Sequence, residues 1–153
     1  MTQSLHPAAQ KGFSSAAELY QQVRPDYPQD IVNWLQDQLQ LGEKSHVIDL
    51  GSGTGKFLPY LQQITSHITA IEPIQEMLAQ LQHAYPEIQT LQASSEHFPV
   101  TANGMDAVIC AQSFHWFANL ETLQQIHQVL KPSGHLALIW NQRDINVDWV
   151  KAL

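Results

Sequence analysis

The sequence has very little cysteine and no long hydrophobic run. Cys110 is the only cysteine among 153 residues, so the chain cannot form an internal disulfide bond. No apolar stretch approaches the roughly 20 residues that a membrane-spanning helix needs. The N-terminus also lacks the charged start and apolar stretch of a signal peptide. Together these absences predict a protein of the reducing cytoplasm, with no membrane partner.

Basic residues are scarce as well. Seven Lys and Arg stand against fourteen Asp and Glu, which gives a formal net charge of −7. A nucleic-acid-binding protein normally carries a basic surface that neutralises phosphates, so we expect no nucleic acid partner. The eight histidines fall in neither an HExxH motif nor a Cys/His cluster, so we expect no metal site.

The residues that are present predict one α/β domain. Hydrophobic residues make up 44% of the chain, and short apolar runs alternate with segments of helical periodicity. Such alternation is typical of a doubly wound, mostly parallel sheet with helices on both faces. Apolar stripes predict helices around 57–64, 74–81 and 123–130. The five predicted strands are His46–Leu50, Ile68–Glu72, Ile88–Gln92, Asp106–Cys110 and His135–Asn141.

A helical segment precedes this core. Ala16–Val23 and Asp30–Leu41 are predicted to be two helices, because Pro25 and Pro28 between them exclude one continuous helix. We therefore divide the chain into an N-terminal helical segment (1–45), a core (46–141) and a tail (142–153).

A glycine-rich loop follows the first strand and predicts a ligand-binding turn. A phosphate-binding P-loop is excluded, because Leu50 and Phe57 occupy its required glycine and Ser/Thr positions. A dinucleotide fingerprint fails at one position, where Lys56 replaces the third glycine, and this alternative stays open. A GxGxG loop with an acidic residue two positions before it fits without exception.

The segment VIDLGSGTGKF resembles motif I of the S-adenosylmethionine (SAM)-dependent methyltransferases. The resemblance implies a Rossmann-like sheet of order 3-2-1-4-5 and SAM as cofactor. Glu72, at the end of the second strand, is placed to accept hydrogen bonds from both ribose hydroxyls. The alternative is a carboxylate at a helix N-terminus, since Pro73 opens the next helix. The cofactor-binding residues implied in and after motif I are Asp49, Gly51, Ser52, Gly53, Thr54, Glu72 and Pro73.

Two further segments extend the resemblance. Residues 93–99 are similar to the family's adenine-facing turn, with Ser95 in place of the usual alanine and Glu96 as the acidic residue. Residues 105–117 resemble the segment after strand 4 in small-molecule carboxyl methyltransferases of the trans-aconitate type, within the type 11 group. This match implies that Gln112 binds the cofactor and that Trp116 forms a wall of the substrate pocket.

Two candidate substrate-binding groups follow from these segments. His115 is a candidate general base near the expected SAM site, and the alternative is simple packing within the aromatic cluster 114–117. Residues 13–28 resemble the N-terminal segment of the same subgroup, which folds over the cofactor. There Arg24, with Tyr20, is a candidate clamp for a carboxylate, and the alternative is an ordinary surface arginine.

The expected activity is in-line methyl transfer to a small molecule, such as a carboxylic acid. Two rivals remain open: a SAM-binding domain without catalysis, and a nicotinamide-dependent oxidoreductase. The sequence stops twelve residues after Asn141, whereas the resembling enzymes have two more strands. We therefore expect a truncated chain whose exposed fifth strand supports a homodimer.

Overall fold

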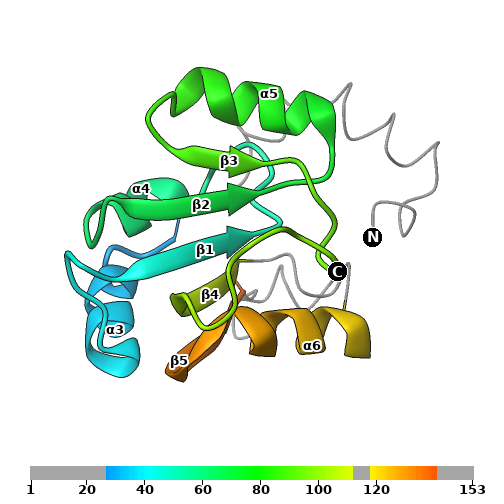
Figure 1. The fold of residues 1–153 in the computed structure, drawn as a ribbon. Coiled ribbons are helices and arrows are strands. Elements are labelled where there is room, and N and C mark those ends of the chain that lie inside the picture. The colour runs from blue at the N-terminus through cyan, green and yellow to red at the C-terminus, as the bar shows by residue number, and fades with distance from the viewer. Residues whose placement is uncertain (1–26, 112–117, 141–153) are drawn as a thin grey trace, which may run out of the picture.

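Five parallel strands form a single sheet in the order β3-β2-β1-β4-β5 in the computed structural model (Figure 1). The structure describes residues 27–111 and 118–140. The elements along the chain are α3 (Asp30–Leu39), β1 (His46–Leu50), α4 (Leu58–Gln62), β2 (His67–Ile71), α5 (Gln75–Ala84), β3 (Gln89–Leu91), β4 (Met105–Ala111), α6 (Leu120–Val129) and β5 (Leu130–Ile139). The predicted fold class and strand order are confirmed.

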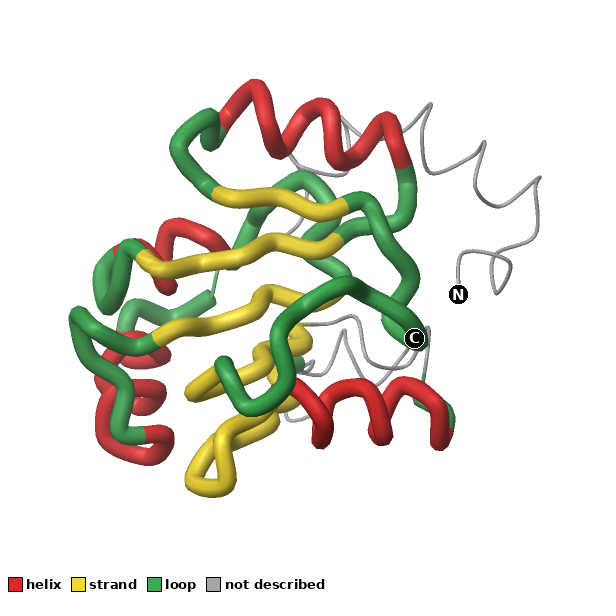
Figure 2. The backbone as a smooth tube through the Cα atoms, in the orientation of Figure 1, coloured by secondary structure: helices red, strands yellow, loops and turns green. Residues whose placement is uncertain are grey.

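Both faces of the sheet are covered, which explains why the central strands read as continuous apolar runs. Side chains alternate between the faces along each strand, so Val47 and Ile48 enter different clusters. The cluster on one face takes in α3 and α4, and the cluster on the other takes in α6 and the segment after β3. Figure 2 shows these helices in red on either side of the yellow strands.

The start of β5 differs from the prediction. We expected a turn at residues 131–134 and a strand from His135, but Leu130 already pairs with Met105 of β4. The register then jumps, and the next pair is Ala107 with His135. Residues 131–134 therefore bulge out of an edge strand, a position where an interrupted ladder is tolerated.

The helices keep the predicted positions with two changes. α3 ends two residues before the predicted Leu41, because Gln40 takes the left-handed conformation with φ of 55°. In α6 the predicted stripe included Leu123, which is 42% exposed, whereas Thr122 is fully buried. The predicted helix Ala16–Val23 lies outside the described residues. In the part of the chain that the structure describes, no helix is long and apolar enough to cross a membrane.

Candidate functional site

The glycine loop lies where the winding of the sheet reverses. β1 sits between β2 and β4. The chain passes from β1 to β2 and β3 on one side of β1 and then to β4 and β5 on the other side. In doubly wound sheets, ligands bind at the carboxyl ends of the two strands at this point. The loop between β1 and α4 therefore occupies the expected binding position.

The end of β2 holds the loop through three successive backbone N–H groups. Gly51 and Ser52 both donate to the carbonyl of Ile71, at 2.8 and 3.1 Å. Gly53 N–H donates to Oε1 of Glu72 at 2.8 Å. Gly55 N–H is bonded as well, to the Ser52 carbonyl at 3.0 Å. These four N–H groups are consequently already bonded within the protein and do not form a free anion-binding nest.

Two of the loop glycines serve different purposes. Gly53 has φ of 59°, and a Cβ built on it would meet no atom within 4 Å. Gly55 has φ of 96°, and a Cβ there would lie 2.8 Å from Cε2 of Tyr85 and 3.1 Å from Cδ1 of Leu58. Gly53 thus leaves open space into which a ligand can approach, whereas Gly55 permits the loop to pack against the protein.

Glu72 is deeply buried and joins the loop to the next helix. Its Oε2 accepts the N–H of Ile74, the residue that caps α5, at 2.9 Å. This contact fits the predicted role at a helix N-terminus. Burial raises the pKa of the Glu72 carboxyl, and the hydrogen bonds from Ile74 and Gly53 lower it by less. A carboxylate can accept about four hydrogen bonds, so two bonds leave acceptor capacity for ribose hydroxyls.

Polar groups of the loop are buried with Glu72. Ser52 Oγ donates to the Asp49 carbonyl at 2.6 Å, which tightens the turn. Asp49 is 1% exposed and lies near Cys110, whose thiol pKa is raised to about 12, mainly by burial and also by the Asp49 charge. Within the described residues no group bonds the buried hydroxyl of Thr54. A buried hydroxyl of this kind is expected to bind a ligand or a water molecule.

The segment after β3 leaves from the carboxyl end of that strand, as the glycine loop does from β1. The Ser95 side chain, which was predicted to contact the cofactor, has a partner within the protein. Ser95 is buried, and its hydroxyl lies 3.0 Å from Oγ1 of Thr122 in α6. The Ser95 side chain therefore links this segment to α6. Sequence reasoning missed Thr122, and the only available signal was a polar residue at a core-facing helical position. Glu96 is half-buried, and the Pro73 carbonyl accepts a bond from Gln92 Nε2 at 3.2 Å.

Five predicted residues lie outside the described parts of the chain and stay predictions: Tyr20, Arg24, Gln112, His115 and Trp116. The first described residue after Arg24 is Tyr27, which is firmly anchored. The Tyr60 hydroxyl accepts the Tyr27 N–H and donates to the Tyr27 carbonyl, both at 3.0 Å. The Tyr27 ring also stands edge-on to Phe57, with centroids 5.0 Å apart.

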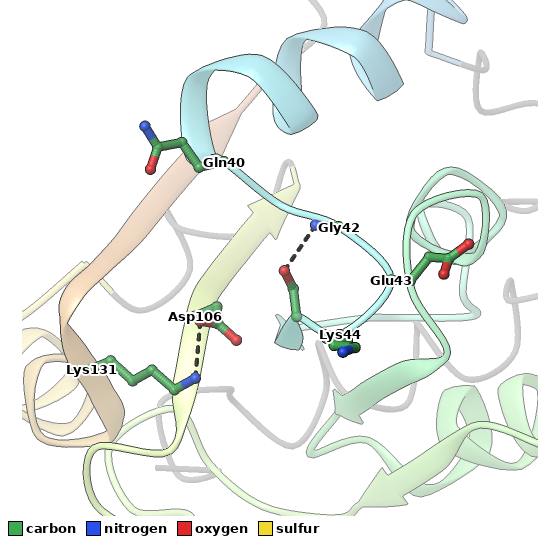
Figure 3. Close-up of a pocket in the computed structure, with 7 residues that line it drawn as sticks. Gln40, Gly42, Glu43, Lys44, Asp106 and Lys131 are labelled. Atoms are coloured by element: carbon green, nitrogen blue, oxygen red, sulfur yellow. Dashed lines mark hydrogen bonds and ion pairs between the residues drawn. The ribbon is translucent and has the colours of Figure 1, made fainter.

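A separate pocket opens at the amino ends of the strands (Figure 3). Its volume is about 510 Å³, and Asp106 and Lys131 form an ion pair of 3.1 Å in its wall. The pocket is lined by residues 40 and 42–45, which precede β1, and by the starts of β4 and β5. It therefore does not belong to the site at the carboxyl ends of the strands. Among the described residues, no three His, Cys, Asp or Glu side chains gather to hold a metal ion.

Comparisons with known proteins identify relatives of the chain. A methyltransferase-domain family matches residues 48–138. An uncharacterised methyltransferase-like protein of Schizosaccharomyces pombe is 40% identical over 144 residues, covering 92% of this chain and 56% of that protein. An uncharacterised methyltransferase of Mycobacterium tuberculosis is 37% identical over 141 residues, covering 92% and 56%. The chain thus spans little more than half the length of these relatives.

Solved structures show the same architecture. The crystal structure of a SAM-dependent methyltransferase from Aquifex aeolicus superposes with a TM-score of 0.68 at 24% identity, covering 86% of this chain and 76% of that one. At this identity the likeness concerns the fold.

Proposed function

Because the chain belongs to the SAM-dependent methyltransferase family, we propose that its glycine loop binds SAM and that the whole protein methylates a small molecule. The acceptor we propose is a carboxylic acid or a similar metabolite. The match covers only 56% of the length of these relatives, so residues outside this chain can complete the substrate pocket.

One observation carries the choice of ligand: the end of β2 already bonds the N–H groups of Gly51, Ser52 and Gly53. A dinucleotide places its pyrophosphate against free N–H groups, which this loop offers at none of those three positions. SAM has no phosphate, and its ribose hydroxyls are donors that match the acceptor capacity of Glu72. The loop is therefore suited to SAM and poorly suited to a nicotinamide dinucleotide.

The other residues are assigned by where they lie. The open face of Gly53 admits the ligand close to the backbone, and the buried Thr54 hydroxyl offers it a hydrogen bond. Asp49 is the last but one residue of β1, immediately before the loop, and we also assign Glu96 and Pro73 to the cofactor site. When bound, SAM supplies a methyl group already activated by its sulfonium charge. The chain then has to orient donor and acceptor in line and exclude water.

The rest of this proposal uses the five predicted residues outside the described ranges, four for the substrate and one for the cofactor. Arg24 and Tyr20 would hold an acidic acceptor, Trp116 would form the pocket wall, and Gln112 would contact the cofactor. His115 would act as general base only for a hydroxyl or amine acceptor, because a carboxylate needs no base.

Two experiments test the proposed function. Calorimetric titration with S-adenosylhomocysteine (SAH), the product of SAM, should show binding, and titration with NAD should not. The reverse result would replace the proposal by an oxidoreductase. Incubation of the protein with labelled SAM and a panel of small carboxylic acids then tests transfer. SAH binding without transfer to any acceptor would favour a non-catalytic SAM-binding domain.

We also propose that two copies associate through β5 and that the protein works in the cytoplasm without a nucleic acid partner. Within the described residues β5 has a hydrogen-bonded neighbour, β4, on one side only, and Trp140 beside its end is 46% exposed. An unpaired apolar edge favours pairing with another chain. Sedimentation analysis should show a dimer, and a monomer at high concentration would contradict this.

A further inference from the structure

We propose that Tyr85 is a positioning residue for the cofactor site, because its ring packs against the backbone of Gly55 and fixes the position of the glycine loop there. This inference rests on the proposed function, since it concerns the loop that binds SAM. Tyr85 follows α5, thirty residues after Gly55 in the sequence, and belongs to no recognisable motif.

The contact between the two residues is close. A Cβ on Gly55 would lie 2.8 Å from Cε2 of Tyr85, closer than real Cβ atoms approach, and 3.1 Å from Cδ2, tighter than most Cβ contacts. The ring therefore lies directly against the Gly55 backbone, on the side where any other residue would carry its side chain. At Gly53 the same construction meets nothing within 4 Å. The ring thus supports the loop on its protein side and leaves the ligand side of Gly53 open.

Tyr85 is itself held rigidly enough to act as a support. Its N–H donates to the Leu81 carbonyl at 2.8 Å, and its own carbonyl accepts the N–H of Ile88 at 3.1 Å. The side chain is partly buried against the core cluster that contains Leu58 and Leu81. Burial, with a smaller contribution from the charge of Glu87, raises the pKa of the Tyr85 hydroxyl. The hydroxyl therefore stays neutral at physiological pH, and packing by the ring is the relevant interaction.

The unit formed by β2 and α5 consequently grips the loop at two points. Glu72, which follows β2, accepts the N–H of Gly53, and Tyr85, which follows α5, packs against Gly55. Between these points lies Thr54, whose buried hydroxyl we assign to the ligand. Loss of either contact should let Thr54 and Gly53 shift, and small displacements of a positioned group weaken binding strongly.

The test compares three variants of the chain by calorimetric titration with SAH and by amide hydrogen exchange without ligand. Y85F keeps the ring and should bind SAH within about twofold of the wild type, whereas Y85A should bind about tenfold more weakly. Y85A should also speed exchange of the Gly53 and Gly55 amides. The control is I88A, which removes a buried side chain of the same core cluster that is not among the atoms closest to Gly55. It should lower the melting temperature and leave both SAH affinity and loop exchange unchanged.

The outcomes separate this inference from the proposed function. If wild-type protein binds no SAH, the proposed function fails, and the exchange of the Gly53 and Gly55 amides still tests the role of Tyr85. If Y85A binds SAH as tightly as wild type, or if I88A weakens binding equally, Tyr85 is only a core residue and the inference is wrong. Should Y85A fail to fold, Y85L retains apolar bulk without the flat ring and takes its place in the same comparison.

Discussion

The backbone N–H of Gly53 and Oε1 of Glu72 are joined by a 2.8 Å hydrogen bond that spans nineteen residues of sequence. This bond connects the two features that together predict a cofactor site, the glycine loop and the acidic end of the second strand. Through this bond the acidic residue shapes the loop, and we propose that it also receives the ribose.

Replacing Glu72 by glutamine should weaken SAH binding by about 1–3 kcal/mol at pH 7, because an amide NH₂ would face one of the two N–H donors. In the wild type, affinity should fall as the pH falls through the raised pKa of Glu72, above the ordinary value of 4.5, since protonation removes acceptor capacity. Calorimetry between pH 4.5 and 7.5 measures both effects.

The control for that titration is E76Q, which removes an exposed carboxylate from the first turn of α5. It should retain the wild-type pH dependence of SAH binding, and E72Q should lose it. An identical pH profile in wild type and E72Q would show that Glu72 does not titrate in the site.

Alanine at the two loop glycines should have different effects. G55A should destabilise the fold by about 2–4 kcal/mol, from a strained positive φ and a clash with Tyr85. G53A should cost about 1 kcal/mol, from the positive φ alone, because its Cβ meets no protein atom. G53A should nonetheless reduce SAH affinity, since the methyl group occupies the open side. Urea unfolding and calorimetry separate the two, and equal destabilisation by both variants would contradict the assignment.

The buried pair of Ser95 and Thr122 should behave as a coupled unit. T122V or S95A alone should destabilise the protein by about 1–2 kcal/mol, because each leaves one buried hydroxyl without its partner. The double variant should cost less than the sum of the two single variants. Urea unfolding of all four proteins gives the coupling energy, and strict additivity would mean that the hydroxyls do not interact.

Tyr60 should contribute to stability mainly through its hydroxyl. Y60F keeps the aromatic packing with Tyr27 and Phe57 but deprives the Tyr27 backbone of both its bonds to this side chain. The expected loss is about 1–3 kcal/mol, measured by urea unfolding. Y85F is the matched control and should change stability less, because within the described residues the Tyr85 hydroxyl bonds no backbone group.

Asp106 should contribute stability that depends on pH. Burial would raise the pKa of its carboxyl, but the His46 N–H and Lys131 outweigh this and hold the pKa below its usual value of 3.8. A lowered pKa in the folded state means that the stabilisation is fully present above pH 3.8 and is lost as the pH falls through the lowered value. D106A should therefore cost about 1 kcal/mol at pH 7 and progressively less in acid. Urea unfolding of wild type and D106A between pH 2.5 and 7 tests this, and a constant difference would contradict it.

Much of the fold follows from local sequence patterns. β1 matches its predicted bounds, and β2 is displaced by one residue, because apolar runs bounded by polar residues mark buried strands clearly. The bulge at 131–134 could not be predicted, because it depends on the register between β4 and β5. Leu123 was assigned to the core because an apolar residue is normally the buried one, but the hydrogen bond to Ser95 makes Thr122 the buried residue instead.

The sequence by itself determined the family and the order of strands and helices, because these depend on short motifs and on periodicity along the chain. Only the tertiary structure decided how the loop is held. The bonds from Gly53 to Glu72 and the packing of Tyr85 on Gly55 join residues 19 and 30 positions apart. Such contacts depend on how β2 and α5 pack beside the loop, and no local pattern encodes that packing. The glycine loop was recognisable from its letters, whereas our proposal that its ligand has no phosphate follows from the N–H groups that the fold has already bonded.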